Sequence, residues 1–101
     1  MLSPSSVTEL QRFHRALGDV NRLRILNVLA TEGEQNVTSL IERLRISGPL
    51  MSWHLRRLRR AGVVRMTRIG REVNCALDRE RFAELQERTF RVLMNRAESA
   101  R

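Results

Sequence analysis

The chain has 101 residues, 42% of them hydrophobic, which predicts a single globular domain over residues 1–101 and excludes a disordered chain. The one cysteine, Cys75, excludes an internal disulfide, and no apolar run approaches the roughly 18 residues that a membrane span requires. All 19 Lys/Arg positions are arginines, and against 11 acidic residues they give a formal net charge of +8. The start of the chain lacks a signal-peptide pattern, and the single cysteine fits the reducing cytoplasm, where the protein is expected.

Two amphipathic helices are expected in the first third of the chain. The segment Ser6-Val7-Thr8-Glu9 has the spacing of a capping box, which predicts a helix over residues 6–17 that begins at Ser6 and ends before Gly18. Its apolar residues at helical spacing are Val7, Leu10, Phe13 and Leu17. A second helix is expected between Asp19 and Gly33, where leucine, isoleucine and valine recur at helical spacing.

Residues 38–60 have the pattern of two short helices joined by a tight turn. Thr38 is placed to cap the first helix, and Ser47 is placed to cap the second. Pro49 is compatible with this assignment, because a proline in the first turn of a helix removes no intrahelical hydrogen bond. The second helix is expected to bury three residues and to leave its opposite face polar; the three are Met51, Leu55 and Leu58.

The apolar period then changes from about 3.6 to 2 residues, which predicts a β-hairpin over residues 63–77 with its turn at Ile69-Gly70. Asp78 follows as the expected cap of a last helix over residues 79–96. The predicted fold class is therefore mainly α (α+β), with four helices, a two-stranded hairpin and one C-terminal helix.

The positive charge is concentrated in one segment. Residues 43–71 contain nine arginines and no acidic residue, whereas the rest of the chain carries ten arginines and eleven acids, a net charge of −1. A solvated face usually interleaves both signs, so this segment predicts binding to a polyanion, above all nucleic acid. A membrane surface and an ordinary solvated face are the alternatives.

At the second predicted helix the sequence resembles a known family. Residues 17–26, Leu-Gly-Asp-Val-Asn-Arg-Leu-Arg-Ile-Leu, are similar to the opening L-x-D-x-x-R-L-x-I-L of the ArsR/SmtB family of bacterial repressors. Residues 47–58 resemble that family's recognition helix, and residues 61–64 and 68–71 resemble the entry and the tip of its wing. The resemblance covers residues 10–95 and implies a winged helix-turn-helix fold. It also implies a cytoplasmic homodimer that binds an inverted-repeat operator in double-stranded DNA and represses transcription, usually including that of its own gene.

The resemblance assigns DNA contacts to the recognition helix and to the wing. Ser52, Trp53 and Arg56 lie opposite the predicted apolar stripe, so groove contacts are expected from them. His54 lies on the flank of the helix, where its family counterpart often contacts DNA and where a packed histidine is the alternative. Arg68 and Arg71, beside the wing tip, are expected on backbone phosphates or in the minor groove. The complete expected set is Ser47, Pro49, Leu50, Ser52, Trp53, His54, Arg56, Arg57, Arg68 and Arg71.

The chain departs from the family pattern at the start of that helix. Family members often carry Gln or Ser there to contact bases, whereas this chain has Gly48 and Pro49, which offer no side-chain donor. Arg45 also replaces the small residue usual in the preceding turn. Base contacts are therefore expected from later positions of the helix, and the operator sequence does not follow from the pattern.

The resemblance also implies that the first and last helices, over residues 6–17 and 79–96, form the dimer interface. Their apolar stripes are expected to supply it, and the alternative is that both stripes belong to the core of one chain. The expected interface residues are Leu10, Phe13, Leu17, Phe82, Leu85, Thr89, Val92 and Leu93.

No metal and no cofactor are expected, and the sequence identifies no inducer. Metal-sensing family members often place two cysteines at the positions of Asn36 and Thr38, or histidine on the last helix, where residues 78–101 contain none. Cys75 alternates with Val73 and Leu77, which predicts a small buried apolar residue; a redox switch is the alternative.

Three other functional classes are disfavoured by the sequence. The sequence shows no Ser/His/Asp arrangement, paired carboxylates or Gly-rich phosphate loop, so an enzyme is not expected. A winged helix that binds another protein is disfavoured by the acid-free segment. An RNA-binding module is disfavoured because the major groove of A-form RNA is too narrow for a helix.

Overall fold

The structure is a computed structural model that describes residues 3–94. In chain order these residues form α1 (Pro4–Leu17), α2 (Val20–Glu32), β1 (Gln35–Asn36), α3 (Val37–Leu44), α4 (Gly48–Arg60), β2 (Val64–Ile69), β3 (Glu72–Leu77) and α5 (Arg79–Met94). The predicted class, mainly α with a hairpin wing and a C-terminal helix, is confirmed. Within the described range, no helix combines the length and the apolar character needed to cross a membrane.

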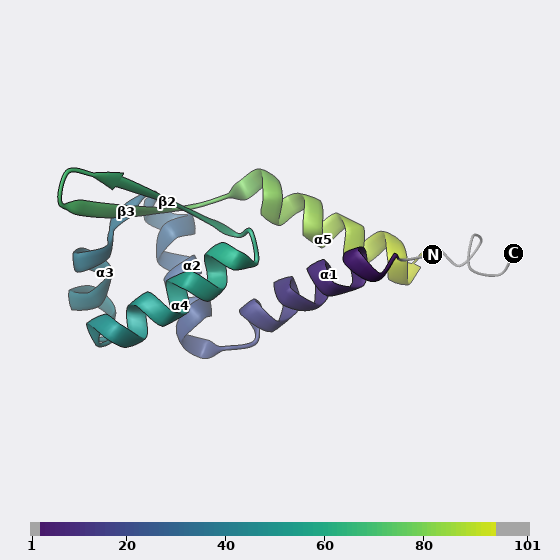
Figure 1. Cartoon of the computed structure of the whole chain (residues 1–101), viewed down its shortest axis with the longest axis horizontal. Helices are drawn as coiled ribbons and strands as arrows, with labels where there is room; N and C mark the ends of the chain where they lie inside the picture. The colour runs from purple at the N-terminus through teal and green to yellow at the C-terminus, as the bar shows by residue number, and fades with distance from the viewer. Residues whose placement is uncertain (1–2, 95–101) are drawn as a thin grey trace, which may run out of the picture.

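The molecule has two parts that meet at the middle of the chain's long axis. Figure 1 shows α2, α3, α4 and the β2–β3 hairpin gathered at one end, while α1 and α5 run in opposite directions beside each other toward the other end. We call α1 and α5 together the arm, and the β2–β3 hairpin the wing. Inside the arm the rings of Phe13 and Phe82 meet edge to face, with 5.3 Å between their centroids. A hydrogen bond of 2.9 Å joins His14 and Thr89.

Local capping chemistry explains where the helices begin, and it corrects two predictions. α1 starts at Pro4, because the Ser3 hydroxyl accepts a hydrogen bond from the Ser6 amide; the predicted capping box at Ser6 is wrong. α3 starts at Val37, because the Asn36 side chain accepts from the Thr38 amide at 2.7 Å, so Thr38 is not the cap. The predicted caps Ser47 and Asp78 are confirmed, and α2 begins where expected, because the Asp19 carboxylate accepts from the Arg22 amide.

The sheet has three antiparallel strands in the order β1-β3-β2, one more than predicted. The wing pairs Val64 with Leu77 and Ile69 with Glu72, as a hairpin turning at Gly70 requires. The extra strand, β1, pairs Gln35 with Cys75 along the free edge of β3. A strand of two residues is too short to show an alternating pattern, so the sequence did not predict β1.

The hydrophobic core joins the arm to the rest of the molecule and includes several residues that the sequence analysis assigns to a dimer interface. Leu10, Phe13 and Leu85 are buried in this core within one chain, and Leu17 and Phe82 pack against it half-buried. Much of the apolar surface of these residues is therefore covered within one chain, and their place at a dimer interface remains a prediction. Further along α5 the apolar side chains are exposed; they are Phe90, Val92, Leu93 and Met94.

Candidate nucleic-acid interface

A tight turn between α3 and α4 sets the direction of α4. Arg45 adopts the left-handed conformation (φ 55°, ψ 46°), and its amide donates to the carbonyl of Ile41 at the end of α3. Ile46, the next residue, is buried and fixes the turn on the core. Ser47 then accepts from the Leu50 amide and starts α4. These contacts hold α3 and α4 as a helix-turn-helix.

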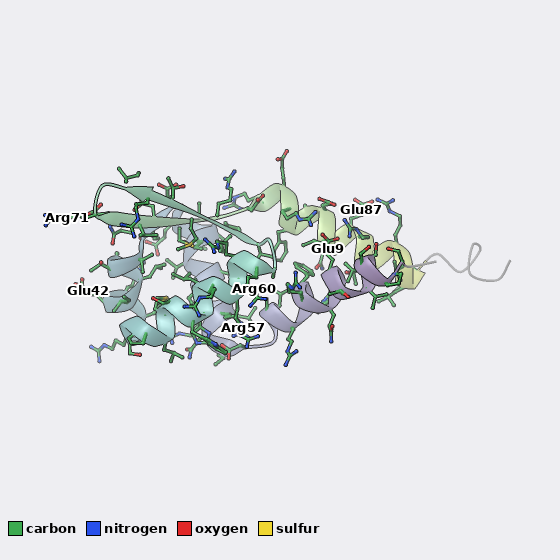
Figure 2. The ribbon with its side chains drawn as sticks, viewed as in Figure 1. Glu9, Glu42, Arg57, Arg60, Arg71 and Glu87 are labelled. Atoms are coloured by element: carbon green, nitrogen blue, oxygen red, sulfur yellow. The ribbon has the colours of Figure 1, made fainter. Side chains whose placement is uncertain are left out.

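One face of α4 is anchored in the core, so its other face is presented to solvent. Met51, Leu55 and Leu58 are buried as predicted. Nine of the ten residues predicted to contact DNA are exposed, and Figure 2 shows one of them, Arg71, at the outer tip of the wing. The nine are Ser47, Pro49, Leu50, Ser52, Trp53, Arg56, Arg57, Arg68 and Arg71.

His54 is the exception, and its burial corrects the expectation that it contacts DNA. The residue is only 2% exposed, and the Nη1 atom of Arg22 lies 3.2 Å from the Nδ1 atom of His54. Because a guanidinium only donates, Nδ1 accepts and the ring proton sits on Nε2, which has no hydrogen-bond partner among the described residues. Burial lowers the pKa of His54 and Arg22 lowers it further, against the opposing effect of Asp19.

Arg22 ties three helices together, a role that the sequence analysis did not identify. The side chain is 6% exposed, and its Nε and Nη2 atoms donate to the carbonyls of Ala16 at 2.8 Å and Arg15 at 3.3 Å at the end of α1. With the contact to His54, Arg22 links α1 and α2 to α4. Arg22 is the arginine of the L-x-D-x-x-R motif, so the motif marks this residue, but the motif alone does not indicate what the side chain binds.

Trp53 is half-exposed and held by two arginines. Its ring lies 4.6 Å from the guanidinium carbon of Arg57 and 5.4 Å from that of Arg22, both within cation–π range. Its side chain remains 39% exposed on the face of α4 that the core does not cover. Trp53 therefore offers an aromatic surface whose orientation is set by neighbouring cations.

A cleft between α4 and the wing brings predicted residues from both elements together. The cleft has a volume of about 560 Å³, and Ser52, Arg56 and Arg68 all line it. Arg59, which the sequence analysis did not single out, lines it as well. Arg71 lies outside this cleft, beyond Gly70, whose φ of 63° permits the turn of the hairpin.

The charges are divided between the two parts of the molecule. On the arm, Glu9 pairs with Arg81 and Arg88, which also pair with Glu84 at 2.9 and 2.6 Å. Seven exposed arginines of α4 and the wing form no ion pair within residues 3–94, and neither α4 nor β2 contains an acid. We call these seven the arginine face; they are Arg56, Arg57, Arg59, Arg60, Arg65, Arg68 and Arg71.

The residues weighed for metal or redox chemistry serve structural purposes. Asn36 caps α3, and Cys75 is buried in the sheet, where burial and then the charge of Glu34 raise the pKa of its thiol to about 12. A thiol with that pKa is protonated at neutral pH and is a poor nucleophile. In the part of the chain that the structure describes, no three His, Cys, Asp or Glu side chains are grouped to hold a metal ion.

A tight helix-turn-helix, an exposed arginine-rich second helix and an adjoining β-hairpin together define a winged helix-turn-helix transcriptional regulator that binds DNA. Comparison with known proteins agrees, since the family model described as "Bacterial regulatory protein, arsR family" matches residues 19–66. The cadmium resistance transcriptional regulatory protein CadC homolog of Staphylococcus aureus is 30% identical over 89 residues, 88% of this chain and 74% of that protein. The chain belongs to the arsR family of bacterial regulators.

Solved structures support the same assignment. An ArsR-like transcriptional regulator from Rhodococcus sp. RHA1 matches with a TM-score of 0.80 and 26% identity, over 95% of this chain and 92% of that one. A further ArsR family transcriptional regulator matches with a TM-score of 0.79 and 25% identity, over 98% of each chain.

Proposed function

We propose that the protein is a homodimeric repressor that binds an inverted-repeat operator in double-stranded DNA and blocks transcription, including that of its own gene. The observation that carries this proposal is the arginine face. Seven exposed arginines without ion-pair partners in residues 3–94 lie on the helix and the hairpin that winged helix-turn-helix proteins direct at DNA. Neutralisation by phosphates is the simplest way to compensate this charge.

α4 would enter the major groove, which is about 12 Å wide and accepts one helix. Ser52 and Arg56 would reach base edges, and the half-exposed Leu50 and Trp53 would contact thymine methyl groups or sugars. The wing would follow the adjacent backbone, with Arg68 and Arg71 on phosphates, and Ser47, Pro49 and Arg57 would lie close to the DNA backbone. Arg59 joins this set because it shares the cleft with Ser52, and His54 leaves it.

The proposed dimer interface is the exposed end of the arm. Phe90 and Leu93 are 65% and 67% exposed, and Val92, Met94 and the half-exposed Val7 lie on the same two helices. Apolar side chains gathered in this way on a small domain usually mark an interaction surface. A two-fold axis through the arm would set two copies of α4 about one helical turn of DNA apart, roughly 34 Å.

Metal-independent, non-enzymatic action in the cytoplasm completes the proposal. The relative from Staphylococcus aureus is described as a cadmium resistance regulator. In this chain the amide of Asn36 is engaged in capping α3 and Thr38 offers no thiolate, so we extend neither cadmium nor another metal to it. The proposed DNA partner would be met in the cytoplasm, and we take residues 38–60 and 63–77 as the DNA-binding part of a single domain.

Hydroxyl-radical footprinting on the DNA upstream of the protein's own gene tests this proposal. Two protected segments about one helical turn apart on the same face of the duplex are expected. The Arg56→Gln variant should weaken the protection of both segments, while Arg91→Gln, which removes an equal charge from α5, should keep it. A single protected segment would contradict the homodimer, and no protection would contradict an operator at this position.

A further inference from the structure

A second cluster of positive charge lies between the arm and α4. A pocket of about 220 Å³ is formed there by α1, α2 and α4, and five of its lining residues are arginines with no acid among the rest. Figure 2 labels Arg57 and Arg60 at this junction of α4 with α1. We call it the arginine pocket; it is lined by Thr8, Gln11, Arg12, Arg15, Ala16, Arg22, Arg57 and Arg60.

The positive charge of the arginine pocket is not compensated within residues 3–94. Arg12, Arg15, Arg57 and Arg60 form no ion pair among these residues, although Glu9 on the same helix pairs with two arginines of α5. Arg22 adds a buried positive charge to the pocket floor, where helix carbonyls and His54 accept its hydrogen bonds. Several guanidinium groups around one cavity repel one another, so an anion in the cavity would relieve that repulsion.

The arginine pocket and the cleft beside the wing lie on opposite flanks of α4. Ser52 and Arg59 line the cleft, whereas Arg57 and Arg60 line the pocket. Successive residues of a helix point about 100° apart, so neighbouring arginines of α4 reach different flanks of the helix. The pocket shares Arg57 and Arg60 with the arginine face, but Ser52 and Arg56, which are proposed to reach base edges, do not line it.

We infer that the arginine pocket binds a phosphate group. Guanidinium groups donate in planar forks that match the oxygens of phosphate, and arginine is favoured over lysine at such sites for this reason. One water molecule needs roughly 10–15 Å³ of such volume, so a cavity of about 220 Å³ holds a phosphate group and ordered water. The phosphate comes either from a small free anion or from the backbone of bound DNA.

Arg57 couples the pocket to Trp53. Its guanidinium carbon lies 4.6 Å from the ring of Trp53 and its side chain also lines the pocket, so a phosphate that draws Arg57 inward weakens the cation–π contact. The side chain of Trp53 then keeps only the contact with Arg22 and can reorient on the exposed face of α4. Phosphate binding itself does not depend on the proposed function, whereas its consequence for DNA binding does.

Fluorescence of Trp53, the chain's only tryptophan, tests the inference without DNA. The protein is titrated with inorganic phosphate and with pyrophosphate at constant ionic strength, with chloride as the reference anion. A saturable change is expected, about tenfold weaker in Arg12→Gln or Arg60→Gln, since a lost charge-assisted hydrogen bond is worth about one order of magnitude in affinity. Arg91→Gln, which removes the same charge from α5, should bind as the unmodified chain does.

The same variants on DNA distinguish the two sources. If the backbone of DNA fills the pocket, Arg12→Gln lowers the salt dependence of DNA affinity by about one phosphate per subunit. If a free anion fills it, the salt dependence is unchanged and pyrophosphate alters the affinity for DNA. The inference is overturned if neither free anion gives saturable binding and Arg12→Gln leaves the salt dependence unchanged, or if Arg91→Gln weakens anion binding equally. Absence of any DNA binding would refute the proposed function and leave the anion titration interpretable.

Discussion

Removal of the Arg22 side chain tests whether this residue holds the helices together. Arg22→Ala deletes three hydrogen bonds, to Ala16 at 2.8 Å, to Arg15 at 3.3 Å and to His54 at 3.2 Å, and leaves buried acceptors without a donor. Hydrogen bonds of charged groups contribute about 1.5–3 kcal/mol each, and loss of one partner of a buried network costs about 3–5 kcal/mol in total. The expected loss in free energy of unfolding is therefore about 3–5 kcal/mol, a large part of the roughly 5–15 kcal/mol of a small domain.

Urea denaturation followed by far-ultraviolet circular dichroism measures this loss independently of Trp53, whose emission Arg22 itself affects. Protein concentration is held fixed, because the proposed dimer would make stability concentration-dependent. Arg12→Ala removes an exposed arginine of α1 and should change stability by no more than about 0.5 kcal/mol. Arg22→Lys should recover only part of the loss, since an ammonium cannot reproduce the planar fork. A loss below about 1 kcal/mol for Arg22→Ala would refute the role assigned to this residue.

Four further predictions follow from burial, charge and exposure. Because burial lowers the pKa of His54 below its usual 6.5, the unfolded chain binds the proton first; stability should be complete above about pH 6.5 and fall below it, and His54→Asn should flatten this part of the pH–stability curve. Phe90→Glu should shift the dimer toward monomer in sedimentation velocity, whereas Val20→Glu, at an exposed apolar site on α2, should not; equal effects would contradict an interface on the arm. Arg71→Ala should weaken binding to all DNA sequences alike and lower the salt slope by about one phosphate per subunit, measured by anisotropy; a sequence-selective loss would rule out a phosphate contact. Cys75, with a thiol pKa of about 12, should resist iodoacetamide in the folded protein and react after unfolding in urea. Rapid alkylation of the folded protein would contradict this prediction and favour a redox role for Cys75.

The sequence allowed the order of the main elements to be predicted because each carries a local signal. Apolar spacing revealed the helices, alternation revealed the wing, and short polar side chains such as Asp19 and Ser47 marked where helices begin. The start of α1 was misplaced because Ser3-Pro4 and Ser6-Glu9 are both plausible start signals, and only the folded chain shows Glu9 committed to arginines of α5.

The partners of each side chain were harder to predict than the elements. An apolar stripe looks the same whether it packs within a chain or between chains, so the sequence could not show that Phe13 and Leu85 are buried within one chain. His54 lies on the flank of α4, where a small rotation of the helix determines whether the side chain faces the DNA groove or the core. Here Arg22, which is far from His54 in the sequence, contacts the ring and holds it in the core. The arginine pocket combines residues from three helices, and no spacing along the chain predicts that combination.

Fluorescence anisotropy of the purified protein on duplex DNA from upstream of its own gene tests the central claim most directly. Binding is measured at about 0.15 M salt against a scrambled duplex and against duplex RNA of the same sequence, a salt concentration at which unspecific binding is typically weaker than about micromolar. The arginine face and the helix-turn-helix predict binding to the upstream DNA at least about a thousandfold tighter than to the scrambled duplex. Equal, weak binding to both DNA duplexes, or tighter binding to the RNA, would contradict a sequence-specific repressor of this gene.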